Sequence, residues 1–316
     1  MRPVPFPTTK LPNSSILLMN GVLIIDKLTG LTSHDVVNRV RRILHERSVG
    51  HLGTLDPMAT GVLPLVVGSF TRLAQFYTQA EKTYEGTIRF GFATDTYDAE
   101  GVPTTDPKEV CLDLGQIESL AAQFRGVIEQ TPPPFSAKKI QGVPAYKLAR
   151  KHKPVALQPV HVEIKEFTIL SVESDRVGFR ARVASGTYMR SVAHELGQKL
   201  GCGAHLEQLR RTAVAEFTLA DAVTLDQLAA AASSTMESFF VHPRKLLPQL
   251  PSVTADDANA ARIRSGRPVN LPELSRARQV KVFYGQAELI AIATRVAGTL
   301  FHAKLVIAAE RTPGAK

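Results

Sequence analysis

The chain of 316 residues has only two cysteines, Cys111 and Cys202, and neither belongs to a CxxC pair. A disulfide framework and a zinc site are therefore not expected, and both thiols are predicted to be reduced, as is typical of the cytoplasm. No run approaches the roughly 18 apolar residues that a membrane-spanning helix needs. Residues 1–15 lack the apolar stretch of a secretory signal. These absences predict a cytoplasmic globular protein with a disordered leader over residues 1–20.

Two catalytic signatures are incomplete. No Gly-Lys-Ser/Thr follows the glycines of residues 50–61, so a phosphate loop is not expected. His194 and Glu195 resemble the start of a zinc-protease helix, but Gln198 stands where the second histidine should be. The sequence therefore predicts no metal site and no nucleotide or redox cofactor.

Positive charge is in excess, with a net charge of +9 at pH 7, and it is gathered in blocks. Residues 137–162 and 261–281 each hold six lysines or arginines, whereas residues 92–119 are mainly acidic. Such segregation predicts a basic surface for a polyanion and an acidic surface turned away from it.

Hydrophobic periodicity predicts a mixed chain of helices and strands. Ser33 is expected to cap the helix that follows it. Other predicted helices are 117–124, 190–200, 225–232 and 255–265, and predicted strands are 21–26, 83–92, 160–170, 176–184, 280–283, 288–294 and 302–307. Three prolines in residues 243–251 indicate a linker. We therefore expect a long mixed domain followed by a small β-rich one.

Residues 49–68 depart most from ordinary composition. Gly50, Gly53 and Gly61 permit backbone turns, and Pro57 keeps Asp56 out of the helical region. An isolated Asp-Pro between glycines is usually a surface turn. Here a strongly apolar stretch follows it, which places the carboxylate on a rigid turn at the edge of a core and favours a functional acid.

Two tyrosines and an arginine are further candidates. A tyrosine on a predicted strand, such as Tyr84, is more often a core residue than a catalytic one. Arg190 is predicted at a helix start, together with the neighbouring Tyr188, and positive charge is unfavourable there. That cost indicates a specific anionic partner, for which a buried carboxylate would qualify. His205, in a glycine-rich corner, is expected to be structural.

These segments together resemble the TruB family of tRNA pseudouridine synthases. The signature is GHLGTLDPMATGVLP at residues 50–64, and six further blocks occur in the expected order, at 23–27, 82–84, 130–139, 146–150, 185–190 and 209–211. His152 departs from the glycine that family members often have, and the segment before Gly21 is longer than the family requires. The resemblance implies an α+β fold. A mixed, mainly antiparallel catalytic domain is expected over residues 21–245, with an RNA-clamping insertion at about 126–155, and a PUA-like RNA-binding domain over 250–316.

The resemblance also implies roles for individual residues. Asp56 is the essential carboxylate, which either attacks C1′ of the ribose as a nucleophile or takes a proton from C2′ to give a glycal. Arg190 pairs with Asp56, and Tyr84 stacks on the target base. The residues expected to bind or surround the substrate are Lys27, His51, Tyr188 and Leu209.

The implied function is the isomerisation of uridine 55 in the T-loop of tRNA by a monomer, without a cofactor, on a flipped-out nucleotide. The basic residues 137–162 would clamp the loop, and the C-terminal arginines would hold the acceptor stem. Two alternatives stay open. One is a guide-RNA-dependent synthase subunit of a ribonucleoprotein, and the other is a non-catalytic chaperone that folds tRNA.

Overall fold

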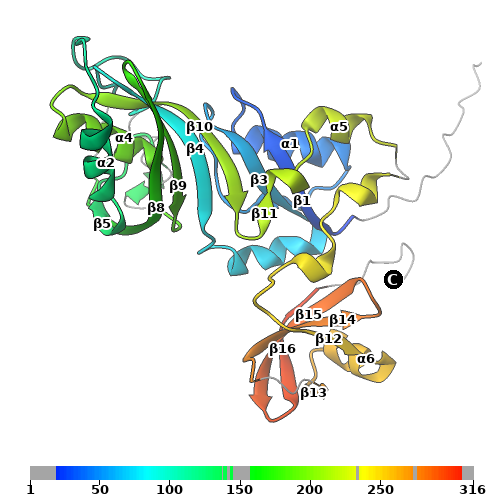
Figure 1. Ribbon diagram of the computed structural model, residues 1–316. Coiled ribbons are helices and arrows are strands. Elements are labelled where there is room, and N and C mark those ends of the chain that lie inside the picture. The colour runs from blue at the N-terminus through cyan, green and yellow to red at the C-terminus, as the bar shows by residue number, and fades with distance from the viewer. Residues whose placement is uncertain are drawn as a thin grey trace, which may run out of the picture.

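The structure is a computed structural model that describes residues 19–136, 138–140, 143–144, 157–232, 235–272 and 276–307. Figure 1 shows a large N-terminal unit and a smaller C-terminal unit below it. Of the predicted leader, residues 1–18 lie outside the described residues, and so do residues 137, 141–142 and 145–155 of the predicted insertion. In the part of the chain that is described, no helix is long and apolar enough to cross a bilayer.

A nine-stranded sheet forms the centre of the larger unit, in the order β1-β3-β10-β4-β9-β8-β5, with β2 added to β3 and β11 to β10. All of its strand pairs are antiparallel except β10 with β3. The strands are β1 (Gly21–Lys27), β2 (Val49–His51), β3 (Thr60–Val67), β4 (Lys82–Phe90), β5 (Gly126–Gln130), β8 (Val160–Glu173), β9 (Arg176–Val183), β10 (Ala204–Val214) and β11 (Phe217–Thr218). A separate small pair comprises β6 (Lys139–Ile140) and β7 (Val143–Pro144). The predicted mixed, mainly antiparallel α+β fold is confirmed.

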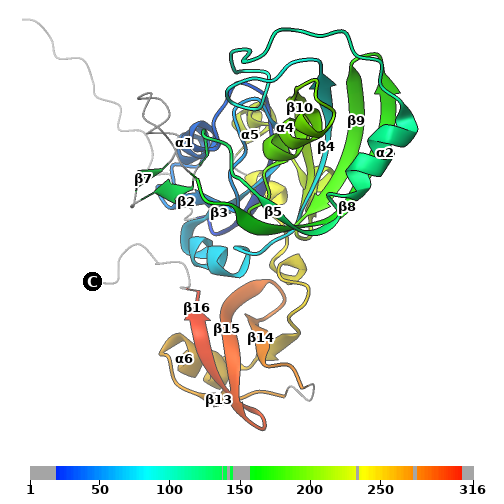
Figure 2. The same cartoon turned by 90° about the vertical axis from the view of Figure 1, so that its left-hand side faces the viewer.

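Helices cover this sheet at two places. In Figure 2, α4 (Met189–Lys199) lies across β10 and β4, and α2 (Leu114–Ala122) runs beside β8. At the other end, α1 (Ser33–Ile43) and α5 (Leu225–Ala230) pack together near β1 and β2. Strands β3, β10 and β4 lie between these two groups of helices, in the middle of the sheet, and β2 pairs with β3.

The cap of α1 differs from the prediction by one residue. Thr32 is the N-cap, because its hydroxyl accepts a hydrogen bond from the Asp35 amide and the Asp35 carboxylate accepts one from the Thr32 amide. Ser33 is buried instead, and its hydroxyl donates to the Leu55 carbonyl at 3.1 Å and accepts from the Leu55 amide at 2.8 Å. Ser33 therefore holds the residue before Asp56 rather than the helix end.

The C-terminal unit contains a five-stranded sheet in the order β12-β14-β15-β16-β13 and the helix α6 (Asp257–Arg264). Its strands are β12 (Ser252–Ala255), β13 (Val269–Asn270), β14 (Gln279–Tyr284), β15 (Glu288–Ala297) and β16 (Leu300–Val306). Lys281, expected on the basic surface, is buried, and its ammonium donates to the carbonyls of Arg244 and Leu246 at 2.9 and 2.6 Å. Burial of this one lysine removes it from any surface that could meet a polyanion.

The connection between the two units is packed rather than loose. Residues 243–245 form a 3₁₀ helix, and the next residues, Leu246 and Leu247, are fully buried. They belong to an apolar cluster that also contains Val22 from β1 and Phe283 from β14. The predicted linker thus contributes to a core that both sheets share.

Candidate active site

Residues 52–59 form a loop between β2 and β3 that carries Asp56. Gly61, the second residue of β3, has φ of +99°, and a β-carbon there would lie 2.2 Å from the Arg211 carbonyl oxygen on β10. Gly53 has φ of +132°, also outside the range that side chains favour. The glycines of the signature therefore let the chain turn sharply and pass against β10.

Arg211 holds this loop from inside the protein. The side chain is fully buried, and its guanidinium donates to the carbonyls of Val62 at 2.8 Å, Gly53 at 3.0 Å and Thr54 at 3.1 Å. Since these carbonyls lie on both sides of Asp56, one guanidinium fixes the loop before and after the carboxylate. No role was predicted for Arg211, although two adjacent arginines on one strand must point to opposite faces of the sheet.

Lys27 holds the loop from a second side. It is fully buried, and its ammonium donates to the carbonyls of Leu31 at 2.7 Å, Leu28 at 3.0 Å and Pro57 at 3.2 Å. Burial lowers the pKa of Lys27 to about 8, against the opposing effect of the Asp56 carboxylate. The structure places Lys27 behind the Asp56 loop and not on the wall of the cavity described below.

Asp56 and Arg190 form an ion pair with 2.9 Å between Oδ2 and Nε. Arg190 is the second residue of α4 and is almost fully buried. Its other nitrogens donate to the carbonyls of Thr96 at 3.2 Å and Phe135 at 3.0 Å, and one lies 3.4 Å from the Asp98 carboxylate. Arg190, whose positive charge is unfavourable at a helix start, thus has two carboxylate partners.

Asp98 corrects the expectation for residues 92–119. The acidic residues of this segment were predicted to form a surface turned away from the polyanion, yet Asp98 is 4% exposed and lies against the same guanidinium as Asp56. A buried arginine with a single carboxylate partner could swing toward it, whereas two partners on different sides fix its plane. Asp98 is therefore positioned to orient Arg190.

The surroundings of Asp56 shift its pKa in opposite directions. Burial raises its pKa above the ordinary range, Arg190 lowers it, and Asp98 raises it again. Its side chain still has 35% of its surface accessible, because it opens into a cavity. The result is a poorly hydrated carboxylate that is reachable from outside and held by one cation.

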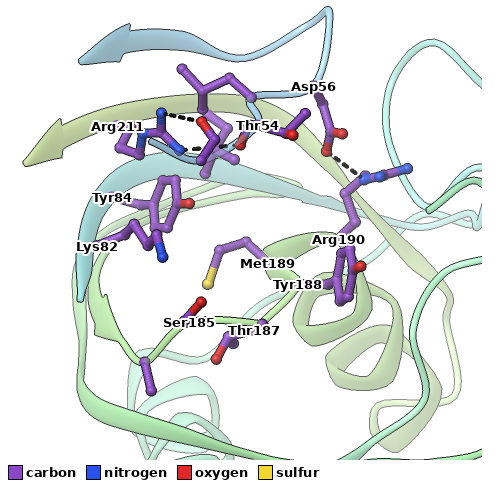
Figure 3. Close-up of a pocket in the computed structure, with 15 residues that line it drawn as sticks. Thr54, Asp56, Lys82, Tyr84, Ser185, Thr187, Tyr188, Met189, Arg190 and Arg211 are labelled. Carbon is purple, nitrogen blue, oxygen red and sulfur yellow. Dashed lines mark hydrogen bonds and ion pairs between the residues drawn. The ribbon is translucent and has the colours of Figure 1, made fainter. Parts of the chain in front are cut away.

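The cavity in front of Asp56 has a volume of about 250 Å³. Figure 3 shows Asp56 and Arg190 on one side of it, Tyr84 and Lys82 on the other, and Met189 and Ser185 between them. Of the seven residues predicted for the site, five line the cavity: Asp56, Tyr84, Tyr188, Arg190 and Leu209. Residues from four separate segments of the sequence thus converge on one space.

Tyr84 and Leu209 reach the cavity because of strand pairing. Tyr84 on β4 lies opposite Arg211 on β10, and Leu209 lies opposite Gly86. Tyr188 is the N-cap residue of α4, and the buried Gln130 side chain binds both its amide, at 2.9 Å, and its carbonyl, at 3.2 Å. Gln130 belongs to one of the blocks that carried the resemblance, but no role was predicted for it from the sequence.

His51 lies at the end of β2, beside the loop but outside the cavity wall. Its Nδ1 accepts a hydrogen bond from the Gly53 amide at 3.3 Å, and burial, together with Arg211, lowers its pKa. His205 is buried with Nδ1 3.2 Å from the Phe92 carbonyl, which agrees with a structural role. Within the described residues, no cluster of histidine, cysteine and carboxylate side chains could hold a metal ion.

Two family models match the chain. Residues 41–189 match the N-terminal domain of the TruB family of pseudouridylate synthases, and residues 190–248 match the C-terminal domain of tRNA pseudouridylate synthase B. The chain belongs to the TruB family. The boundary between the two matches falls inside α4, between Met189 and Arg190, so each match contributes one partner of the Asp56–Arg190 ion pair.

Relatives support the same assignment over most of the chain. The tRNA pseudouridine synthase B of Solibacter usitatus is 50% identical over 294 residues, which cover 92% of this chain and all of that protein. The synthase of the same name from Aquifex aeolicus is 38% identical over 291 residues, again 92% of this chain and all of the relative. TruB membership therefore extends well beyond the signature at residues 50–64.

A solved structure also resembles the whole fold. A chain of the archaeal box H/ACA sRNP Nop10–Cbf5 complex superimposes with a TM-score of 0.67 at 25% identity, over 92% of this chain and 87% of that chain. The TruB family matches end at residue 248, before β12 begins at Ser252. The PUA-like character of residues 250–316 remains a prediction.

Proposed function

We propose that this TruB-family protein converts uridine to pseudouridine at position 55 in the T-loop of tRNA, with Asp56 as its catalytic carboxylate. Isomerisation of uridine in tRNA follows from family membership and from the named relatives. The choice of position 55 is our inference. The observation that carries the site assignment is the Asp56–Arg190 ion pair, which opens into a cavity walled by Tyr84, Tyr188 and Leu209.

The reaction breaks the N1–C1′ bond of uridine and makes a C5–C1′ bond, with no net gain or loss of atoms. When the first bond breaks, its electron pair stays on the uracil. Asp56 either forms a bond to C1′ or removes a proton from C2′, and in both cases it must be ionised. The uracil turns, and C5 bonds to C1′ while the Asp56–C1′ bond breaks or, on the second route, while the proton returns from Asp56 to C2′. The C5 proton then leaves and N1 takes up a proton, so no atom is gained or lost.

Arg190 supports both routes. Its guanidinium favours the ionised form of Asp56 and holds one carboxylate oxygen, which directs the other toward the cavity. Because Asp98 and two backbone carbonyls fix Arg190 itself, this geometry is present before the substrate arrives. Preorganisation of this kind is a major source of rate acceleration.

The other wall residues suit a flat, uncharged base. Tyr84 offers an aromatic ring for stacking, Leu209 an aliphatic surface, and Tyr188 a second ring beside Arg190. Stacking of a base on an aromatic side chain contributes about 1–3 kcal/mol. A flipped-out uridine would fill the cavity and displace water from around Asp56.

We expect recognition of the tRNA to depend on loop shape and phosphate contacts. The basic residues 137–162, of which 157–162 and few others are described, would clamp the T-loop, and the C-terminal arginines would hold the acceptor stem. The protein would act as a monomer in the cytoplasm and without a metal ion.

The test is a pseudouridine assay on an unmodified tRNA transcript, with the purified chain and no guide RNA. We expect turnover at uridine 55 with the wild type and a loss of at least about 10⁴-fold with Asp56→Asn, while tRNA affinity is kept. Asp106→Asn, at an exposed aspartate, is the matched control and should retain full activity.

The same assay separates the alternatives. A guide-RNA-dependent subunit would leave the free transcript unmodified. If the protein were a tRNA-folding chaperone, the Asp56→Asn variant would function as well as the wild type. Turnover by Asp56→Asn at the wild-type rate would overturn the site assignment.

A further inference from the structure

Lys82 is a cavity-lining residue to which the mechanism above gives no role. It is the first residue of β4, two positions before Tyr84, and its ammonium donates to the Ala80 carbonyl at 2.6 Å. Its stem passes the Asp56 loop, since a β-carbon at Gly53 would lie 3.7 Å from its Cε. In Figure 3 the ammonium points into the cavity on the side opposite Asp56.

The other two cations of the cavity wall are already engaged. Arg190 is bound to Asp56 and Asp98, and Arg211 is bound to three backbone carbonyls. Within the residues that the structure describes, the three N–H groups of Lys82 make one hydrogen bond, and no ion pair joins Lys82 to an acid. A half-buried ammonium whose N–H groups lack acceptors is unfavourable unless another group accepts hydrogen bonds from them.

The reaction supplies such a partner. When the N1–C1′ bond breaks, the uracil takes the electron pair, and the negative charge spreads onto its two carbonyl oxygens. Asp56 makes its own side of the cavity negative, so the developing charge is better placed near a cation on the other side. Hydrogen-bond donors that face charge formed during a reaction are worth more than those that face the ground state.

We propose that the Lys82 ammonium donates a hydrogen bond to a carbonyl oxygen of the target uracil and stabilises the charge that the base carries while it is detached from the ribose. No proton is transferred in this step. The negative charge on the base disappears when C5 bonds to C1′. The C5 proton then leaves while N1 takes up a proton, so the product base is neutral. This role rests on the assignment of the cavity as the active site.

The electrostatic surroundings give the role a pH dependence. Burial, with a smaller contribution from Arg211, lowers the pKa of Lys82 to about 8. The charged and titratable groups around the cavity are Arg211 on β10, Asp56 on its loop, Tyr84 on β4, and Tyr188 and Arg190 at the start of α4. Because the protonated form is the donor, kcat should fall as the pH rises through about 8.

Two variants test the proposal, with Lys165→Met, at an exposed lysine that pairs with Glu81, as the control. Lys82→Met keeps the apolar stem and should lower kcat by about 10²–10³-fold with little change in KM. Lys82→Arg should keep kcat within about tenfold of wild type and move the alkaline fall to higher pH, because the guanidinium stays protonated. The arginine variant also separates Lys82 from Lys27, whose pKa is likewise lowered to about 8.

Transcripts with 2-thiouridine or 4-thiouridine at the target position identify the carbonyl. Sulfur is a weaker acceptor than oxygen, so one of the two substitutions should slow the wild type and have no further effect on Lys82→Met. The two changes would then show a non-additive, coupled loss. Equal losses in wild type and variant with both thio substrates would contradict a contact between Lys82 and a carbonyl.

Other outcomes also decide the question. A wild-type kcat in Lys82→Met would overturn the proposal, and so would a rise in KM alone with a shallower salt dependence, which indicates a phosphate contact. If Lys82→Met fails to fold, the alkaline limb of Lys82→Arg still decides: an unchanged limb contradicts the role. Activity in Asp56→Asn would instead refute the site as a whole, whereas an inactive Asp56→Asn beside a fully active Lys82→Met refutes Lys82 alone.

Discussion

The cations around the Asp56 loop and those of the C-terminal unit are used in opposite ways. Near the loop, Lys27, Arg190 and Arg211 are buried and bind carbonyls or carboxylates of the protein itself. In the C-terminal unit, Arg267 and Arg278 lie exposed on the surface. The same residue types therefore fix a backbone in one region and present charge to the solvent in the other.

Burial, and not the number of basic residues, separates these two uses of lysine and arginine. A buried cation needs several protein acceptors to offset its lost hydration, so it is held in one geometry. An exposed cation keeps its hydration and acts at a distance that salt limits to about 8–10 Å. Lys281 shows that position in the sequence does not decide, since it belongs to the C-terminal basic block and is buried on two carbonyls.

The largest effect is expected for Arg190→Ala, which removes the buried cation that touches Asp56. We expect kcat to fall by about 10³-fold, because the carboxylate loses its partner and its orientation. Arg190 lowers the pKa of Asp56, so its removal raises that pKa, and the activity, which requires the ionised form, is then lost at a higher pH on the acid side. A pH–rate profile measures both effects.

Arg182→Ala is the control for that variant, because Arg182 pairs with Glu81 and Glu166 at the surface. Its profile should match the wild type. An acid limb at the same pH in Arg190→Ala and wild type would show that Arg190 does not set the charge of Asp56.

The next effect concerns stability and compares two adjacent arginines on β10. Arg211→Met leaves the carbonyls of Gly53, Thr54 and Val62 without their buried donor, and we expect the free energy of unfolding to fall by about 2–4 kcal/mol. Arg210→Met breaks a partly exposed pair with Asp26, whose effect should stay below about 1 kcal/mol. Urea unfolding of both variants measures the difference. Equal losses would mean that burial does not distinguish the two roles.

The regular elements of this fold are readable from the sequence because each one buries a local pattern. The predicted strands at 160–170 and 176–184, for example, appear as β8 and β9, joined at Ser174. The central strand β10 was missed. Its pairing with β4 shifts register between Leu206 and Gln208 and again between Arg211 and Ala213, and these irregularities break the alternation by which a strand is recognised.

The residues of the site likewise differ in whether the sequence predicts them. Asp56 could be predicted because glycines, proline and an apolar stretch mark its loop locally. An anionic partner for Arg190 could be expected from the sequence, since a cation at a helix start is unfavourable without one. Asp98 and Gln130, however, lie about 90 and 60 residues from Arg190 along the chain and reach the site through tertiary packing alone. Arg211 and Lys82 needed the strand register, which a bulged strand conceals.

A smaller effect is expected at Lys27, where a buried cation touches no substrate. The pKa of Lys27 is lowered to about 8 in the folded chain, against an ordinary value of 10.5. Between these pH values the unfolded chain binds more protons, so folding becomes more favourable as the pH rises. Relative to Lys27→Met, the wild type should therefore gain roughly 1–3 kcal/mol between pH 8 and pH 10. Chemical unfolding at several pH values measures this gain, and a difference that stays constant would contradict the lowered pKa of Lys27 in the folded chain.

The smallest effect is expected in the C-terminal unit. If Arg267 and Arg278 contact phosphates of the acceptor stem, each change to alanine weakens tRNA binding only a few-fold but lowers the slope of log affinity against log salt by about 0.7–0.9. Lys281→Met is the opposite case: because its ammonium binds two protein carbonyls, the change should reduce stability and leave the salt slope unaltered. Binding titrations at several salt concentrations, beside unfolding curves, measure both quantities for all three variants. A reduced salt slope in Lys281→Met, or an unchanged slope in both arginine variants, would show that solvent exposure does not determine which lysines and arginines contact RNA.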